Sequence, residues 1–222
     1  SLRCIGRGSL TDWRGVSMVE IMARLNARGL TTTHIGPLDL TLAPGECLGL
    51  AGPSGSGKSQ LLRALADLEP REGELVLDGV PADSLPPAEW RRRVGLLPAE
   101  PVWWEPTVGA HFPNDAGPCL AALGLDRAML GRAPMTCSTG ERQRLALARL
   151  LARDPQVLLL DEPTANLDAA SAGRVVECIR ERRDTGVAVL WVAHDEAELG
   201  RVADRRLTLV DGRLDTGEAA WS

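Results

Sequence analysis

The residues best suited to chemistry in this chain form one short run between positions 52 and 60. The run reads Gly52, Pro53, Ser54, Gly55, Ser56, Gly57, Lys58, Ser59 and Gln60. Its glycines let main-chain N–H groups turn toward phosphate oxygens without a Cβ in the way. Lys58 offers a compact, mobile charge for the outer phosphates, and the Ser59 hydroxyl is a ligand for Mg²⁺. The spacing and the residue types together predict a loop that binds the phosphates of a nucleotide.

Composition and context both support this prediction. The chain has 25 Lys plus Arg, and Lys58 is its only lysine, which indicates a specific chemical need at this position. Residues 46–51 form an apolar run typical of a buried strand, and residues 60–65 have a helical pattern. We expect a helix to begin at Lys58 and to direct its N-terminus at the bound anion.

Two carboxylates follow a second apolar run. Residues 157–160 predict a strand buried on both faces, and Asp161 and Glu162 come directly after it. At the tip of a central strand beside a phosphate loop, Asp161 would hold Mg²⁺, through water. Glu162 would polarise an attacking water molecule. Taken alone, the pair is equally compatible with a solvated turn.

Ser138 and Gly140 precede an arginine-rich amphipathic helix predicted over residues 139–153. They offer a hydroxyl, main-chain N–H groups and a helix N-terminus, which together could hold a second anion. The simpler interpretation is helix capping by Ser138 or Thr139, with Glu141 in the first turn, and the residues alone favour it.

His194 follows a buried strand predicted over residues 187–192. In an open α/β sheet this position lies over the ligand crevice, although the histidine could instead cap the next helix. His34 and His111 have no such placement, and we interpret both as structural.

The alternation of predicted strands and helices indicates a parallel α/β sheet covered on both faces. We expect one P-loop NTPase core over residues 22–216, with an antiparallel β part near its N-terminal end and a short helical subdomain at 99–153. Residues 98–118 predict an irregular connector, whereas residues 1–21 predict a disordered tail or a remnant of cloning. Other strands are expected at 23–30, 37–42, 73–79, 94–97 and 207–210, and other helices at 86–93, 119–130, 169–183 and 195–202.

Bulk composition narrows the classes of function. Hydrophobic residues make up 44% and charged residues 25%, as in soluble globular proteins, and the net charge of −5 gives no argument for a nucleic-acid partner. No apolar run approaches the roughly 20 residues that cross a bilayer, so service to a membrane would require docking on another chain. The five cysteines form no CxxC pair and predict reduced core thiols of an intracellular protein.

Together these motifs resemble the ATP-binding cassette ATPases, the motor subunits of ABC transporters. The likeness runs from about Met22 to Leu214, and the order of the motifs makes it specific. After the phosphate loop, residues 138–149 resemble the family's signature segment and 158–163 its Walker B strand with the catalytic glutamate. Residues 165–168 resemble the D-loop, and residues 192–195 resemble the switch-histidine segment.

This resemblance implies ATP and Mg²⁺ as cofactors and a head-to-tail homodimer. Each ATP would lie between Lys58 of one subunit and Ser138, with Gly140, of the other. Glu162 would serve as the base, and His194 would contact the γ-phosphate. Closure on ATP would then drive a separate transmembrane permease, which places the chain in the cytoplasm, peripheral to the inner face of the plasma membrane.

Three positions depart from the family pattern. Ala99 occupies the place of a glutamine that contacts Mg²⁺ and water in the family, although the adjacent Glu100 could replace it in part. Thr139 replaces a signature glycine and brings a Cβ close to phosphate. The family stacks an aromatic ring on adenine just after the first strand, where this chain has Gly29 or Leu30, a loss of about 1–3 kcal/mol by analogy with base stacking.

The connector also holds Trp103, Trp104 and Phe112, which either form a docking groove for a permease or pack the subdomain core. The run over residues 188–195 is similar to that of small bacterial ATPases of the iron-export type. An alternative function is a nucleotide-gated dimerisation module with little turnover, for which Ala99, Thr139 and the missing aromatic ring argue. A cassette acting on DNA or ribosomes would need a long insertion or a second cassette, for which 222 residues leave no room.

Overall fold

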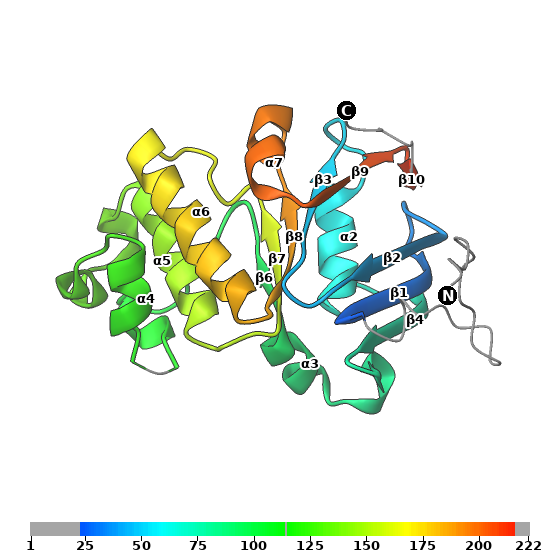
Figure 1. The fold of residues 1–222 in the computed structure, drawn as a ribbon. Coiled ribbons are helices and arrows are strands. Elements are labelled where there is room, and N and C mark those ends of the chain that lie inside the picture. Colours follow the sequence, from blue (N-terminus) through cyan, green and yellow to red (C-terminus); the bar gives the residue numbers. More distant parts are fainter. Residues whose placement is uncertain (1–22, 114, 216–222) are drawn as a thin grey trace, which may run out of the picture.

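The computed structural model describes residues 23–113 and 115–215. The expectations for residues 1–21, and for the ends of the predicted core at positions 22 and 216, lie outside this range. Two β-sheets and the helices packed around them make up the described part of the chain (Figure 1).

The larger sheet has six strands in the order β10-β9-β3-β8-β7-β6. Strands β9, β3, β8, β7 and β6 pair in parallel, and β10 joins β9 antiparallel. The bounds are β3 Cys47–Ala51, β6 Val94–Leu97, β7 Val157–Asp161, β8 Ala188–Val192, β9 Arg205–Val210 and β10 Arg213–Asp215. The predicted parallel α/β core is therefore confirmed.

The register of this sheet places the chemical residues at one edge. Leu50 of β3 lies opposite Val192 of β8, and Val192 lies opposite Asp161 of β7. Parallel strands direct their carboxyl ends to the same edge of a sheet. The segments that follow these three strands, with the phosphate loop, Glu162 and His194, consequently emerge next to one another.

The position of β7 inside the sheet explains why its sequence is continuously apolar. Leu158 and Leu160 pack into the core on one face of the sheet, whereas Val157 and Leu159 pack into the core on the other face. Successive side chains of a strand point to opposite faces, so a strand covered on both sides needs apolar residues at every position.

The smaller sheet is antiparallel and has the order β2-β1-β4-β5. Its strands are β1 Leu25–Thr31, β2 Leu38–Leu42, β4 Glu72–Leu77 and β5 Val80–Pro81. Its apolar residues share one core with helix α2 (Lys58–Leu65) and one face of the larger sheet. Figure 1 accordingly shows α2 between the two sheets. The antiparallel β part and the hairpin turn at Asp78–Gly79 are confirmed.

The other face of the larger sheet is covered by helices whose residues form the second core. These are α4 Gly117–Ala122, α5 Thr139–Leu151, α6 Ala169–Asp184 and α7 Glu196–Val202, while α3 Pro87–Arg93 lies before β6. Figure 1 shows α4, α5 and α6 grouped together, on the opposite side of β7 and β8 from α2. None of the helices in the described ranges is both long and apolar enough to cross a bilayer.

The single helix predicted over residues 119–130 is wrong. Helix α4 ends at Ala122, and a separate 3-10 helix, η3, spans Arg127–Gly131. Gly124 has a φ of +64°, which ends the first element. The Asp126 carboxylate accepts the main-chain N–H of Ala128 at 2.7 Å and so starts the second.

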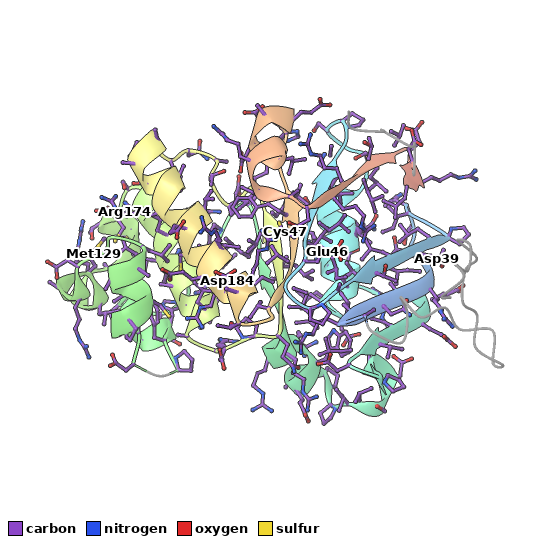
Figure 2. All side chains as sticks on the ribbon, viewed as in Figure 1. Asp39, Glu46, Cys47, Met129, Arg174 and Asp184 are labelled. Carbon is purple, nitrogen blue, oxygen red and sulfur yellow. The ribbon has the colours of Figure 1, made fainter. Side chains whose placement is uncertain are left out.

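The cysteines of the described residues, at positions 47, 119, 137 and 178, are free and buried. Cys47 lies at the start of β3, next to Glu46 (Figure 2). Burial raises the pKa of the Cys47 thiol to about 12 and that of the Cys178 thiol to about 11. Both therefore stay protonated at neutral pH and act as small apolar groups of the core.

Candidate active site

The phosphate loop connects β3 to α2 as predicted, and α2 begins at Lys58. Lys58 is buried, and its ammonium donates to the carbonyl oxygens of Gly52 and Pro53, each at 2.8 Å. Burial lowers the pKa of Lys58, and the nearby charges of Glu162 and Asp161 act in the opposite direction. An ammonium has three donors, so two of them hold the loop and one remains for a phosphate oxygen.

Two glycines of the loop have no space for a side chain. A Cβ on Gly52 would lie 2.2 Å from the Leu209 carbonyl oxygen, and Gly52 has a φ of +142°. A Cβ on Gly57, whose φ is +102°, would lie 2.4 Å from Cγ2 of Ile35. The requirement for glycine at these positions thus comes from the protein itself, before any ligand is considered.

The loop also contains a buried hydroxyl without a partner. Ser56 is 7% exposed, and its Oγ makes no hydrogen bond within residues 23–113 and 115–215. Native proteins rarely leave a buried polar atom unpaired, so such an atom inside a loop of main-chain donors fits a site built around phosphate oxygens. Ser59, in the first turn of α2, is exposed and available.

The two carboxylates lie beside this loop. Asp161 is the last residue of β7 and is buried, with 6% of its surface exposed. Glu162 has a φ of +50°, an unfavourable value for a residue with a side chain, and its main-chain N–H donates to the Val192 carbonyl at 3.0 Å. Strain of this kind persists where the surroundings fix a conformation, and it is frequent at functional sites.

Glu162 and His194 form a direct pair. His194 Nε2 lies 2.8 Å from Glu162 Oε1, a hydrogen bond if the imidazole is neutral and an ion pair if it is protonated. The structure therefore brings together Lys58, Ser59, Asp161, Glu162 and His194 at one edge of the sheet. Serine, carboxylate and phosphate oxygens are ligands that Mg²⁺ accepts, so the donors present fit a magnesium nucleotide.

The signature segment lies elsewhere in the same chain. Ser138 caps α5: its Oγ accepts the N–H of Glu141 at 3.2 Å, and Glu141 Oε2 accepts the N–H of Ser138 at 2.7 Å. The capping interpretation is thus confirmed. Ser138 is the N-cap of α5 and Gly140 lies in its first turn, and Figure 1 shows α5 across β7 and β8 from α2.

The three departures have distinct environments. Ala99 is exposed and lies two residues beyond the end of β6, at the same edge of the sheet as Asp161. Thr139 is exposed, and its Oγ1 accepts from Arg142 at 3.3 Å. Leu30 is fully buried in the core within β1, so it presents no surface to a base.

Of the three aromatic residues in the connector, two fit the core-packing interpretation and one fits the docking interpretation. Trp103 and Phe112 are partly buried and pack against the core, whereas Trp104 is 64% exposed. Sequence reasoning missed that His111 is buried between the two tryptophans, with ring centroids 4.9 Å from Trp103 and 4.7 Å from Trp104. It also missed Glu198, which contacts the loop after Glu162. Neither residue lies in a recognisable pattern.

The fold and the site together define a P-loop ATPase cassette. A family model described as "ABC transporter" matches residues 35–165. The chain is 39% identical over 204 residues to the hemin import ATP-binding protein HmuV of Myxococcus xanthus, covering 81% of this chain and 76% of that protein. It is 41% identical over 205 residues to the aliphatic sulfonates import ATP-binding protein SsuB 2 of Frankia alni. This match covers 87% of this chain and 80% of that protein.

A third relative, STAR1 of Oryza sativa subsp. japonica, is 37% identical over 212 residues, and the chain spans 61% of its length. A solved ATP-binding cassette, a dimer in a post-hydrolysis state bound to ADP and Pi, superimposes with a TM-score of 0.77 at 24% identity, covering 86% of this chain and 96% of that one. This second likeness supports the fold. The chain belongs to the ABC transporter family and is an ATP-hydrolysing subunit of that family.

Proposed function

We propose that this chain hydrolyses ATP in a Mg²⁺-dependent reaction and thereby drives a separate membrane permease. The observation that carries the proposal is the Glu162–His194 pair, 2.8 Å apart, at the same sheet edge as the buried Lys58. Lys58, the main-chain donors of residues 52–57 and the side chains of Ser59 and Gln60 bind the triphosphate. When bound, Mg²⁺ would neutralise charge on the outer phosphates, held by Ser59 and, through water, by Asp161.

Glu162 acts as the general base in this proposal. Its carboxylate accepts the proton of the attacking water, and His194 orients that carboxylate and contacts the γ-phosphate. The left-handed backbone of Glu162 fixes the starting direction of its side chain, because the main-chain bond to Val192 prevents the loop from relaxing. Positioning of this sort accounts for much of the rate of phosphoryl transfer.

We infer that two copies of the chain bind ATP head to tail. Ser138 and Gly140, at the N-terminus of α5, lie across the sheet from the phosphate loop of their own chain. Each would therefore serve the ATP held by Lys58 of the second copy. The Ser138 hydroxyl and the α5 N-terminus supply donors to a phosphate oxygen. A solved cassette of the same fold is described as a dimer.

The proposal is tested by measuring phosphate release and sedimentation with ATP and Mg²⁺. Lys58→Ala should reduce turnover more than 100-fold, because it removes the charge that faces the outer phosphates. Glu162→Gln should also stop turnover but retain an ATP-induced dimer, since only the base is lost. Glu177→Gln, on the exposed face of α6, is the matched control and should behave like the wild type. An ATP-induced dimer of the wild type without phosphate release would instead favour a gating module.

We further propose that the permease docks beside Trp104. A cavity of about 400 Å³ lies between the two cores, and Leu68, Val102 and Trp104 line it with 48%, 66% and 64% of their surfaces exposed. Arg91, Arg149 and Arg153 also line it. Exposed apolar side chains among cations suit an amphipathic helix that carries acidic residues. The relatives' names favour an importer over the iron-export type. Docking on a permease would place the chain at the cytoplasmic face of the membrane.

Docking is tested by co-purification with a multi-span membrane protein encoded beside this chain. Trp104→Ala and Val102→Ser should each weaken the association at least tenfold, because both remove apolar area from the groove. Val210→Ser makes the same change at an exposed valine on β9, outside the groove, and should leave the association intact. Equal binding by all three variants would place the permease elsewhere.

A further inference from the structure

Glu198 of α7 connects strand β8 to the loop after Glu162, because one of its carboxylate oxygens accepts a hydrogen bond from each. Its Oε1 atom accepts the hydroxyl of Thr164 at 2.5 Å and the indole N–H of Trp191 at 2.9 Å. Trp191 is buried in β8, and Glu198 and Thr164 are half-buried. Trp191 therefore fixes the carboxylate against the rigid sheet, and the carboxylate fixes Thr164.

Thr164 belongs to the loop that carries the proposed base. Glu162 and Asn166, two residues away on either side, have φ values of +50° and +63°. Main-chain bonds close the loop on itself, from Ala165 N–H to the Glu162 carbonyl at 3.1 Å and from Leu167 N–H to the Thr164 carbonyl at 3.2 Å. A loop with two such residues needs outside contacts to hold its conformation.

The far end of the same loop touches the signature helix. A Cβ on Gly140 would lie 3.1 Å from Cδ2 of Leu167 and 3.3 Å from the carbonyl oxygen of Asn166. Residues 162–167 thus extend from the proposed base to the N-terminal turn of α5. A contact at Thr164 lies between these two ends.

We propose that Glu198 is a positioning residue for ATP hydrolysis, acting through Thr164 on Glu162. His194 lies just before α7 and Glu198 lies in its first turn, and they contact the loop at Glu162 and Thr164 respectively. Loss of the Glu198 contact leaves the phosphate loop intact but lets the base leave its position. The inference depends on the proposed function, because it assigns the effect to the hydrolytic step.

Two substitutions at Glu198 can distinguish the loss of its hydrogen bonds from the loss of its negative charge. Both partners of Glu198 are neutral donors, so the amide oxygen of a glutamine can accept the same two bonds. Glu198→Gln should therefore keep kcat within about twofold of the wild type. Glu198→Ala should lower kcat about tenfold, because small displacements of a catalytic group are costly, with KM for ATP changed less than twofold.

Thr164→Val provides a second, nearly isosteric route to the same loss. It should lower kcat as Glu198→Ala does, and the double variant should be no worse than either single variant, because both remove one interaction. Glu196→Ala, in the exposed first turn of α7, is the control and should match the wild type.

Hydrogen exchange of the nucleotide-free protein gives a readout independent of turnover. The amides of Ala165 and Leu167 should exchange faster in Glu198→Ala and Thr164→Val, and at the wild-type rate in Glu198→Gln and Glu196→Ala. Unchanged kcat and exchange in Glu198→Ala, or a Glu198→Gln variant as impaired as Glu198→Ala, would overturn the inference. If the wild type itself releases no phosphate, the proposed function fails, and the exchange comparison still decides whether the Glu198 contact holds the loop.

Discussion

The phosphate loop and the tryptophan loop, which we define as residues 102–112, hold their shapes in opposite ways. In the phosphate loop the conformation comes from adjacent residue types, glycines with positive φ and one lysine bonded to the loop's own carbonyls. In the tryptophan loop it comes from side-chain contacts, made by His111 within the loop and by Arg149 from α5. The glycines and the lysine of the first loop form a pattern that can be recognised in the sequence, whereas the residues that hold the second loop form no such pattern.

His111 is the centre of the tryptophan loop. Its Nε2 accepts the main-chain N–H groups of Trp104 and Glu105, each at 2.9 Å, and Nδ1 lies 3.0 Å from the Thr107 carbonyl. Two donors at Nε2 require an unprotonated nitrogen there, which assigns the proton to Nδ1. One buried imidazole thus replaces the main-chain bonds that a helix or strand would supply.

Arg149 of α5 closes this loop from the other side. Its guanidinium carbon lies 4.6 Å from the ring centroid of Trp103 and 5.1 Å from that of Trp104. Burial, and then the neighbouring Arg153, lower the pKa of Arg149 to about 10, so it stays charged at neutral pH. The charge over both rings stabilises the loop by a cation–π interaction of about 1 kcal/mol or more.

The largest predicted effect comes from a substitution that disrupts the phosphate loop. Gly52→Ala should lower the free energy of unfolding by about 4 kcal/mol, because the new Cβ meets a main-chain carbonyl at 2.2 Å and φ is +142°. Urea unfolding measures this change. The matched control is Gly173→Ala in α6, where a Cβ meets nothing within 4 Å and alanine should be neutral or stabilising. Equal stability of the two variants would show that the loop does not require glycine at position 52.

The second-largest predicted effect comes from a substitution that disrupts the tryptophan loop. His111→Ala should lower the free energy of unfolding by about 2 to 3 kcal/mol, because two main-chain donors lose their acceptor and two ring contacts disappear. His34→Ala makes the same change at an exposed position and should cost less than about 0.5 kcal/mol. Both are measured by chemical denaturation. A His111 variant as stable as the His34 variant would show that the loop does not depend on the imidazole.

The same contrast explains what could be predicted. The strand before Asp161, the helix start at Lys58 and the meeting of Glu162 with His194 follow from apolar runs and strand-end placement, and the structure agrees with them. The expected helix over residues 119–130 failed because the positive φ of Gly124 outweighed the helical pattern. The role of His111 depends on contacts with main-chain groups inside its own loop, and that of Glu198 depends on Thr164 and Trp191. Neither set of contacts follows a periodicity that could be recognised in the sequence.

The smallest effect concerns the cap of α5, which is locally encoded but lies on the same side of the sheet as the tryptophan loop. The main-chain N–H of Ser138, and then its hydroxyl, hold the pKa of Glu141 below its usual value. A depressed pKa contributes stability above the unfolded-state value near 4.5 and loses it as the pH falls through the folded-state value.

Glu141→Gln tests this cap, because the amide still accepts from Ser138 but does not titrate. At neutral pH the wild type should be more stable by about 0.5 kcal/mol, from the charge near the helix N-terminus. Urea unfolding between pH 7 and pH 3 should show this difference vanish at the acid end, as Glu141 takes up its proton. Ser138→Ala keeps the main-chain donor, which is the largest cause of the depressed pKa, so its stability should retain most of the wild-type pH dependence. Parallel pH curves for the wild type and Glu141→Gln would mean that the carboxylate charge contributes nothing to the cap.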